Sequence, residues 1–513
     1  MAKGGVEKRV EKLTALLDIG KAMTAERDLD RLLPLIMGEV TKVMEADRST
    51  LFLVDRERGE LWSKIAQGLE VREIRVKIGT GIAGHVAATG RVVHIPDAYA
   101  DPRFDRSTDR RTGYRTRSIL AVPMANKPGE VIGVIQALNK REGTFEDEDI
   151  DLLQALSGQA AVAVENAILY EDIQNLFEGF IKAAAYAIET RDPTTFGHSE
   201  RVATLTCSLA EHLDRVERGP YADVRFTPQD MRELRYASLL HDFGKVGVRE
   251  HVLVKANKLY DHDLEGVKAR FGSLRKQMEL DALRQKVAVL SARRPEEARM
   301  DLQAIDEWVQ GEMARLDADL QFILEANRPS LLPQGGFERI VEIARKTFVD
   351  ADGKTQPILT RREAENLSIG KGTLNAEERL EIESHVTHSF HFLRQIPWTR
   401  DLRRIPTIAY AHHEKLNGAG YPNRLTAENI PLQARMMTVA DVYDALTASD
   451  RPYKKAMPPE GALDILQMEA KGNAIDAELV RLFIESKTYA LTVPGARKPS
   501  APAAPRAGPA AGR

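Results

Sequence analysis

The sequence predicts an α+β domain built on an antiparallel sheet, followed by an all-α domain that contains an inserted helical hairpin. Three observations support this fold class. Six short runs of alternating apolar residues, separated by turn residues, lie between residues 49 and 140. After Arg191 the apolar residues recur almost entirely at helical spacing. The 513-residue length accommodates about two to four domains of ordinary size.

The bulk composition is that of an ordinary globular protein, with 43% hydrophobic and 29% charged residues. The formal net charge of -3 argues against bulk electrostatic binding to a nucleic acid polymer. Cys207 is the single cysteine, which rules out an intramolecular disulfide and suits a reducing compartment. The N-terminus lacks the apolar core of a secretory signal, and no apolar run approaches the roughly 20 residues of a membrane helix. We therefore expect a cytoplasmic protein without membrane insertion.

The α+β domain is expected at residues 29–165, after an N-terminal helix at residues 1–28. Apolar residues at helical spacing predict helix from about residue 6 to residue 45. The strands are expected in the runs STLFLVD, ELWSKIA, REIRVKI, RVVHIPD, SILAVPM and EVIGVIQALNK. Turns such as DRERGE and NKPGE separate these runs, which favours an antiparallel sheet flanked by helices.

One long helix is expected at residues 146–188, overlapping both domains. The segment from Phe145 to Thr190 has no proline and little glycine, and it carries a continuous apolar stripe. The helix either packs on its own domain or pairs with its copy in a homodimer. Its length between two domains favours the homodimer, because long patterns without caps are typical of coiled coils.

The helical domain is expected at residues 180–490, with an insertion at about residues 256–370. Within the insertion, apolar residues at 3-4-3-4 spacing in residues 262–327 predict an antiparallel helical hairpin that turns near Pro295. The hairpin is interpreted as an arm for packing or docking. The tail at residues 494–513 is rich in proline and alanine and is expected to be disordered.

Histidines and carboxylates on several separate helices form the one set of residues that indicates chemistry. The candidates are His198, His241, Asp242, His385, His388, His391, His412, His413, Asp441 and Asp444. Nitrogen and carboxylate ligands without cysteine suit a hydrolytic centre of iron, manganese or a similar divalent ion better than structural zinc. Two such ions about 3.5–4 Å apart can clamp a phosphoryl group.

Basic residues accompany this set. Lys245 follows Asp242 by three residues and is suited to neutralising a phosphate oxygen or managing a proton. The run DRPYKK supplies Arg451, Lys454 and Lys455 shortly after Asp441. Without the metal set, these three would be interpreted as a solvated basic surface.

The motifs GHSERVA, LLHDFGK, HHEKLNGAGYP and VADVYDALTASDRPYKK, in this order, resemble the HD-GYP family of cyclic-dinucleotide phosphodiesterases, a branch of the HD metal-dependent phosphohydrolases. The resemblance covers about residues 180–490. It implies an all-helical fold and hydrolysis of cyclic diguanylate by a metal-bridged hydroxide to linear pGpG, and often onward to GMP.

The resemblance also implies the roles of individual residues. The implied metal ligands are His198, His241, Asp242, His385, His412, His413 and Asp441. Asp242 would bridge the ions, and Lys245 matches the catalytic lysine. Tyr421, Arg451 and Lys454 match positions that contact guanine or phosphate.

Three features depart from that family. Members with a third metal carry a glutamate where this chain has Thr194, so we expect two divalent ions, iron or manganese. Asn417 replaces the common aspartate of the glycine-rich motif. The long insertion is the third departure, and it either covers the site or docks a partner. His388 and His391 fall outside the implied ligand set and are expected at the surface.

The runs GTGIAGHVAATGRVVHIPDAYADPRF and GYRTRSILAVPM, with NKREGTFEDED after them, resemble a GAF sensor domain. Asn139, Lys140, Phe145 and Asp149 match the signature of cyclic-nucleotide-binding members, while Ile150 replaces its final glutamate. The resemblance implies a structural Lys140–Asp149 clasp and, for the domain, either a small-molecule ligand or a role in dimerisation alone.

Together these resemblances imply a GAF-regulated cyclic diguanylate phosphodiesterase. The alternative is a catalytically weak signalling scaffold that binds a cyclic dinucleotide and recruits a GGDEF-type protein through the insertion. A third hypothesis keeps the phosphodiesterase and changes the substrate to another cyclic dinucleotide.

Overall fold

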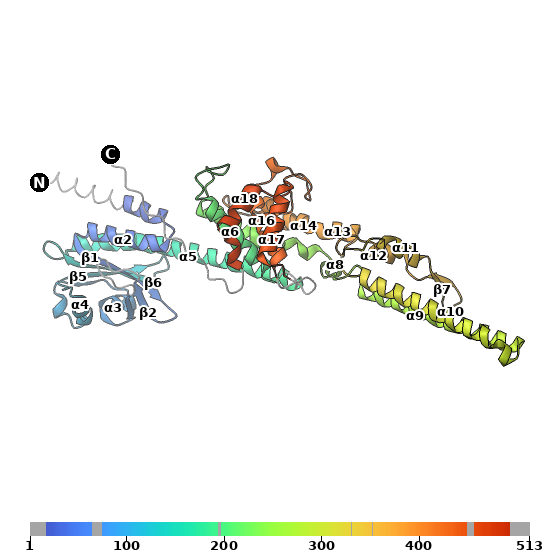
Figure 1. Cartoon of the computed structure of the whole chain (residues 1–513). Helices are drawn as coiled ribbons and strands as arrows, with labels where there is room; N and C mark the ends of the chain where they lie inside the picture. The colour runs from blue at the N-terminus through green and yellow to red at the C-terminus, as the bar shows by residue number, and fades with distance from the viewer. Residues whose placement is uncertain are drawn as a thin grey trace. The chain divides into compact units, whose positions relative to one another are not determined.

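The computed structural model describes residues 17–63, 74–192, 196–329, 331–350, 352–448 and 456–492. The tail expected to be disordered lies outside these residues, as do Thr194, Arg451, Lys454 and Lys455. The chain divides into two units between Gly179 and Phe180. This division falls within helix α5 (Asp147–Arg191), so one continuous helix belongs to both units (Figure 1). The predicted long helix is thereby confirmed.

The first unit is built on a six-stranded antiparallel sheet in the order β3-β2-β1-β6-β5-β4. The strands are β1 (Ala46–Asp55), β2 (Glu60–Ser63), β3 (Ile74–Lys77), β4 (Val93–Ile95), β5 (Ile119–Ala125) and β6 (Val131–Lys140). In the central pair, Leu51 of β1 lies opposite Ile135 of β6. Each of the six runs identified in the sequence contains all or most of one of these strands among its described residues.

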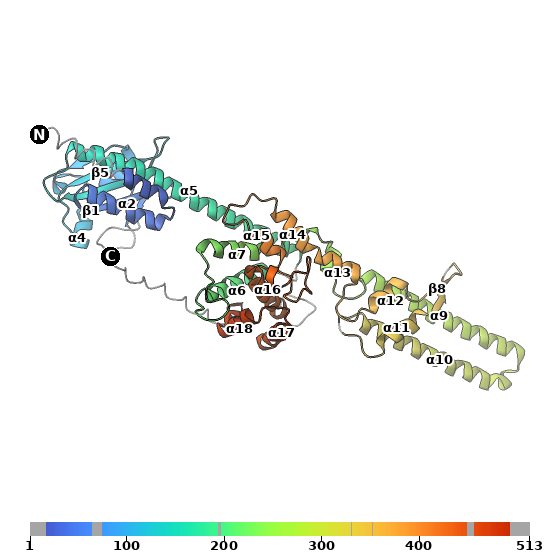
Figure 2. The ribbon, with the colours of Figure 1, turned by 90° about the horizontal axis from the view of Figure 1, so that it is seen from above.

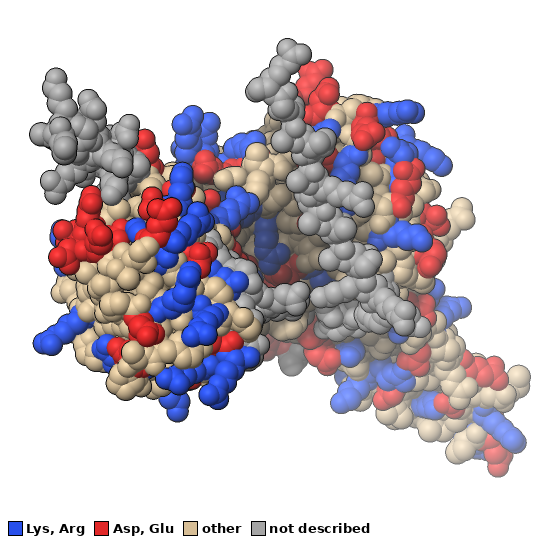
Figure 3. All heavy atoms as spheres, turned by 90° about the vertical axis from the view of Figure 1, so that its left-hand side faces the viewer, with Lys and Arg blue, Asp and Glu red and all other residues tan. Residues whose placement is uncertain are grey.

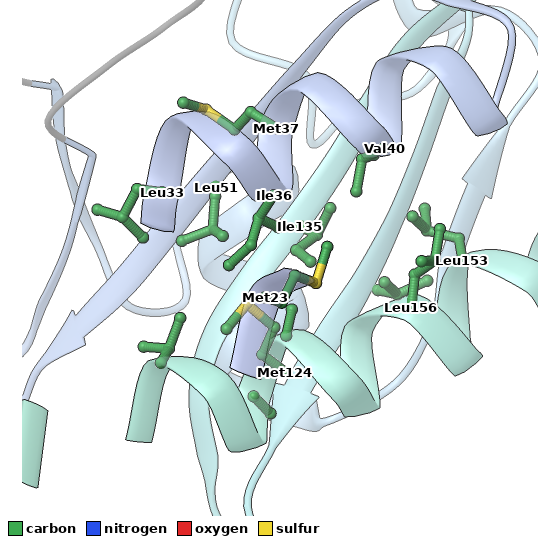
Figure 4. Close-up of a cluster of buried hydrophobic side chains, with 14 of the residues drawn as sticks. Met23, Leu33, Ile36, Met37, Val40, Leu51, Met124, Ile135, Leu153 and Leu156 are labelled. Atoms are coloured by element: carbon green, nitrogen blue, oxygen red, sulfur yellow. The ribbon is translucent and has the colours of Figure 1, made fainter. Parts of the chain in front are cut away.

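Helices cover both faces of this sheet, because successive strand residues point to opposite faces. Leu51 and Leu53 share a buried cluster with α2 (Leu29–Val43) and α5. Figure 4 shows Ile36 and Val40 of α2 in this cluster, with Leu153 and Leu156 of α5 and Ile135 of the sheet. Phe52, between the two leucines, belongs instead to the cluster around α3 (Gly81–Thr89). The remaining elements of this unit are η1 (Ala98–Ala100) and α4 (Arg106–Thr112).

Helix α2 begins where a side chain satisfies its free backbone groups. The carboxylate of Asp28 accepts a hydrogen bond from the backbone N–H of Asp30, as is typical of an N-cap aspartate. Residues 26–28 interrupt the helix expected from residue 6 to residue 45, and residues 1–16 of that helix lie outside the described chain.

The second unit is mainly helical. Outside the insertion, its elements are α6 (His198–Leu213), α7 (Pro228–Leu240), η3 (Phe243–Gly247), α8 (Glu250–Leu253), α13 (Ala376–Glu383), α14 (His385–Leu393), α15 (Ile405–Tyr410), η4 (Ala427–Asn429), α16 (Leu432–Thr447), α17 (Pro459–Lys471), α18 (Ala477–Glu485) and η5 (Thr488–Thr492). Thr227 and Asp230 form a reciprocal capping box at the start of α7, and Asn375 and Glu378 form one at α13. These caps define where two helices that precede candidate ligands begin.

The insertion contains the predicted antiparallel hairpin, formed by α9 (Asp261–Ala292) and α10 (Pro295–Ala326), which lie side by side in Figures 1 and 2. Pro295 begins α10, where a missing N–H does no harm. Short elements complete the insertion: α11 (Gly336–Ala344), β7 (Thr347–Val349), β8 (Thr355–Pro357) and α12 (Arg361–Leu367).

The β7–β8 ribbon corrects the expectation that the chain is helical throughout this region. Each strand has three residues, too few for an alternating pattern to be recognised in the sequence. The Asp350 carboxylate accepts hydrogen bonds from the backbone N–H groups of Asp352 and Lys354, which stabilises the turn between the strands.

Among the described residues, α5 is long and apolar enough to cross a membrane by length and composition. A single helix of this kind is weak evidence for a membrane span, so the expectation of no membrane insertion stays a prediction. Half of the most apolar 18-residue stretch of α5 is buried within the structure. Core helices of soluble proteins can have the same length and composition. Figure 3 shows Lys and Arg interspersed with Asp and Glu on the face that it presents, consistent with the small net charge.

Candidate metal centre

The second unit brings all seven predicted ligands together from five separate segments. His198 begins α6, His241 and Asp242 follow α7, His385 begins α14, His412 and His413 follow α15, and Asp441 lies within α16. Their ligand atoms form three overlapping groups, each with all its atoms within 4.8 Å of one another. The groups are Asp242, His385, His412 and His413; His198, His241 and Asp242; and His241, His412 and Asp441.

Hydrogen bonds to the backbone fix three of the histidine rings and leave the other ring nitrogen available as a ligand. The Nδ1 atoms of His241, His385 and His412 bond to the backbone carbonyls of residues three positions earlier. A carbonyl only accepts, so each Nδ1 carries the proton and each Nε2 carries a lone pair. Within the described part of the chain these three Nε2 atoms are buried without a hydrogen-bond partner. A buried polar atom without a partner is costly, so the three nitrogens fit a divalent metal centre.

Asp242 lies between two sets of histidines. Its Oδ1 is 3.2 Å from Nε2 of His385 and 4.0 Å from Nε2 of His412. Its Oδ2 is 3.5 Å from Nε2 of His241 and 3.8 Å from Nε2 of His198. Burial alone would raise the pKa of Asp242, but Lys245 and the surrounding histidines lower it well below its usual value. An ionised carboxylate in this position is suited to bridging two ions.

His198 is oriented by carboxylates on both sides. Its Nδ1 donates to Asp444 at 2.8 Å, and its Nε2 lies 3.2 Å from Asp441. Burial alone would lower the pKa of His198, but the hydrogen bonds to Asp441 and Asp444 raise it to about 9. Arg201 in turn donates to Asp444 and fixes that carboxylate. A carboxylate behind a histidine orients the ring and increases its basicity as a ligand.

His413 lies on the more open side of the centre, with 28% of its side chain exposed. Its Nδ1 is 3.9 Å from Oδ2 of Asp441, and its ring centroid is 4.8 Å from that of Tyr421. Burial lowers the pKa of His413 to about 4, so the ring is neutral at pH 7. Burial also lowers the pKa values of His241 and His412. Neutral imidazoles have the lone pairs that metal ligation needs.

Lys245 is clamped between two carboxylates. Its Nζ lies 2.9 Å from Oδ2 of Asp242 and 3.1 Å from Oδ2 of Asp192. Burial alone would lower the pKa of Lys245, but the two carboxylates raise it above its usual value. The side chain is therefore a cation beside the predicted bridging ligand.

Gly244 and Ser389 join the segment that carries His241 and Asp242 to helix α14, which carries His385. The Ser389 hydroxyl accepts from the backbone N–H of Gly244 at 2.7 Å and donates to the carbonyl of His241 at 2.8 Å. A Cβ on Gly244 would lie 1.9 Å from the carbonyl oxygen of His385 and 2.3 Å from the backbone nitrogen of Ser389. Only glycine lets these two backbones approach so closely.

Replacing Gly244 by alanine is therefore expected to destabilise the second unit by about 3 kcal/mol or more, because two backbones would have to separate. The matched control is Gly272→Ala in α9, where no atom lies within 4 Å of the added methyl group. That substitution is expected to stabilise the protein by about 0.5–1 kcal/mol, because alanine favours helix. Thermal unfolding by calorimetry compares the two, and equal transitions would contradict this close contact.

Glu414 organises the glycine-rich turn that follows the paired histidines. Its buried carboxylate accepts from the backbone N–H groups of Asn423 and Leu425, at 2.7 and 2.8 Å. Asn417 stabilises the same turn: its Oδ1 accepts from Ala419 N–H, and its Nδ2 donates to the carbonyl of Gly472. An aspartate in place of Asn417 would lack that donor.

Several supporting residues were not predicted from the sequence. Asp192 and Ser389 act through contacts with segments distant in the sequence, which no local spacing reveals, whereas Glu414 acts on the turn that follows it. Asp444 was among the candidates, and its position three residues after Asp441 on one helix is a usable signal. His388 and His391 are exposed, as expected. The predicted contacts of Arg451 and Lys454 fall outside the described residues.

The first unit contains the clasp implied by its resemblance. Lys140 Nζ lies 2.9 Å from Oδ1 of Asp149, and both side chains are largely buried. Asn139 donates to the Tyr114 hydroxyl and the Arg115 carbonyl, while Phe145 is buried beside Lys140. These residues close the end of β6 onto the start of α5.

Comparison with known proteins agrees with this arrangement. Residues 28–164 match the GAF domain family, and residues 195–319 and 362–479 each match an HD domain family. The probable 3',5'-cyclic phosphodiesterase pde-5 of Caenorhabditis elegans is 34% identical over 172 residues, which cover 31% of this chain and 24% of that protein. The chain thus spans about a quarter of the length of that curated relative.

Solved structures similar to part of the chain include a GAF domain and a reductase. The GAF domain of a phosphoenolpyruvate-protein phosphotransferase from Coxiella burnetii is 22% identical, with a TM-score of 0.29, and covers 31% of this chain and 96% of that one. A free methionine-R-sulfoxide reductase from Neisseria meningitidis is 23% identical, with a TM-score of 0.28. The match covers 32% of this chain and 93% of that one.

The fold and the family matches together define the class of protein. The chain has an N-terminal GAF fold and a predominantly helical C-terminal region with HD domains. Within the HD region, the described histidines and aspartates form clusters that could hold metal ions.

Proposed function

We propose that this protein is a GAF-regulated, metal-dependent cyclic-nucleotide phosphodiesterase of the HD-GYP type, acting in the cytoplasm. Its substrate is cyclic diguanylate, which it opens to pGpG and then cleaves to GMP. The observation that carries the proposal is the convergence on one ionised aspartate of three buried Nε2 atoms that have no partner among the described residues. The HD matches and the similarity to a probable 3',5'-cyclic phosphodiesterase of C. elegans support the same chemistry.

In this proposal the residues of the centre bind the metal ions, stabilise charge on the phosphate and contact the nucleotide. Two divalent ions, iron or manganese, would supply Lewis-acid stabilisation of the phosphoryl oxygens when bound. His198, His241, His385, His412, His413 and Asp441 would hold them, with Asp242 shared between the two. The Lys245 ammonium would offset charge that develops on the phosphate. Tyr421, Arg451 and Lys454 would contact the nucleotide.

The direct test uses protein purified without oxygen and loaded with iron or manganese. Cyclic diguanylate and 3',5'-cyclic GMP are supplied separately, and products are followed by chromatography. Appearance of pGpG or GMP from cyclic diguanylate supports the proposed substrate. Turnover of the cyclic mononucleotide alone would keep the phosphodiesterase and replace the substrate.

The proposal includes a homodimer formed through α5. Leu169, Ile173, Leu176 and Phe180 recur at spacings of four, three and four, and all are more than half exposed. This is the a/d pattern of a coiled-coil seam. Helix α5 belongs to both units. A ligand that binds the GAF domain and changes the pairing of α5 would therefore also affect the HD region.

Leu176→Lys is expected to weaken this dimer by about 100-fold or more, because it buries a charge in the seam. Gln174→Lys is the matched control, since it adds the same charge to an exposed position of α5 outside the stripe. Sedimentation velocity at micromolar concentration separates monomer from dimer. A Leu176→Lys protein that remains dimeric would contradict this seam.

A second candidate function is a catalytically weak scaffold that recruits a GGDEF-type protein through the insertion. One observation favours it: Leu280, Leu283, Val287 and Leu290 form an exposed apolar stripe on α9. Exposed stripes of this kind are typical of interaction surfaces. A purified GGDEF-type protein that binds the full chain, but not a Leu283→Lys, Val287→Lys variant, would support this role. Equal binding to both proteins would contradict it.

A further inference from the structure

A cavity of about 400 Å³ opens beside the metal centre, lined by Glu383, Gly418, Ala419, Gly420, Tyr421 and Arg424. Its volume falls in the roughly 300–1,000 Å³ range of small-molecule sites. Tyr421 connects the cavity to the centre, because its ring lies 4.8 Å from that of His413. A ligand held at the metals is therefore adjacent to this cavity.

The cavity contains two opposite charges that do not pair with each other. Neither the Glu383 carboxylate nor the Arg424 guanidinium makes a hydrogen bond or ion pair with any described residue. Glu383 is the last residue of α13, where the helix dipole disfavours a negative charge. A carboxylate without a partner at this end of a helix gives the fold no evident benefit, which indicates a ligand.

The backbone around Arg424 is fixed before any ligand binds. The carboxylate of Glu414 accepts hydrogen bonds from the N–H groups of Asn423 and Leu425, on either side of Arg424. Gly420, in the same lining, is held close to the preceding turn, since a Cβ there would lie 2.3 Å from the backbone nitrogen of Lys415. The Tyr421 ring, also in the lining, offers a surface on which a flat group can stack.

We infer that this cavity reads a guanine base, with Glu383 accepting from the base N1–H and N2–H groups and Arg424 donating to O6 and N7. A guanidinium fork matches the two guanine acceptors, which is the commonest specific protein contact to this base. A carboxylate matches the two adjacent donors of guanine. Adenine presents a single amino donor beside a ring-nitrogen acceptor, so it leaves one carboxylate oxygen facing a lone pair.

This inference rests on the proposed function and assigns the recognition of its guanine base to Glu383 and Arg424. Glu383 and Arg424 would thus determine specificity without taking part in the bond cleavage. Their removal is expected to change the choice of base and not the chemistry at phosphorus.

The test compares the full-length, metal-loaded protein with Glu383→Gln, Arg424→Lys and the control Glu377→Gln, an exposed residue of the same helix. The kcat/KM values for cyclic diguanylate and cyclic diadenylate give the base preference. Bis(4-nitrophenyl) phosphate, a diester without a base, reports the chemistry alone. Binding of GMP and AMP is measured by calorimetry, and bound metal is measured for each protein.

The guanine preference is expected to fall by about 10- to 100-fold in Glu383→Gln and in Arg424→Lys, which keeps the charge and loses the fork. Hydrolysis of the base-free diester and the metal content stay unchanged, as do all values for Glu377→Gln. An unaltered guanine preference, or loss of metal from Glu383→Gln, would overturn the inference. If no diester is hydrolysed by the parent protein, the proposed phosphodiesterase fails, and equal binding of GMP and AMP then separately overturns this inference.

Discussion

Asp242→Asn is expected to abolish the proposed cyclic-nucleotide hydrolysis, with a loss on the order of 10³-fold or more. The carboxylate of Asp242 lies 3.2–4.0 Å from four histidine nitrogens, with two of them near each of its oxygens. An amide is nearly isosteric, so packing is retained. It is neutral and offers one acceptor oxygen, so it cannot bridge two cations as a carboxylate does.

The measurement is turnover of cyclic diguanylate, together with metal content, for the parent protein and two variants. Asp464→Asn, an exposed residue of α17, is the matched control and should keep full activity. Thermal unfolding of the metal-free proteins checks that Asp242→Asn remains folded. Substantial turnover by folded Asp242→Asn protein would exclude Asp242 as the bridging ligand.

The strands and the long helix of the first unit could be predicted because they are local features. An alternating run such as EVIGVIQALNK gives β6 two faces, and both faces are covered in the structure. The β7–β8 ribbon could not be predicted, because three residues per strand do not form a recognisable pattern. The break at residues 26–28 could not be predicted either, since apolar residues recur at helical spacing on both sides of it.

The candidate ligands could be identified because their motifs are sequence runs, such as the paired histidines 412 and 413. The groups that orient them could not, because these contacts depend on tertiary structure. Ser389 joins η3 to α14 across about half of the HD region's sequence, and Asp444 supports His198 from another helix. Arg424 and Glu383 line one cavity only because the turn folds beside the end of α13.

Loading the protein with manganese is expected to raise the thermal unfolding temperature of the second unit, and chelation is expected to reverse this. A ligand that binds only the folded state stabilises it by about 2.7 kcal/mol at a free concentration 100 times its dissociation constant. The folded centre already contains the buried Nε2 atoms of His241, His385 and His412 without partners in the described chain. A metal ion would satisfy these nitrogens, so the expected shift is about 5 °C or more.

His412→Ala tests whether this centre is responsible for the stabilisation. The variant removes one free Nε2 and should lose most of the manganese-dependent shift, because the remaining ligands bind the ion more weakly. His391→Ala, which removes an exposed histidine of α14, should keep the whole shift. Calorimetry with and without manganese gives this result independently of catalytic activity. An equal shift in both variants would mean that the ion binds elsewhere, and the two-ion assignment of these seven residues would then be wrong.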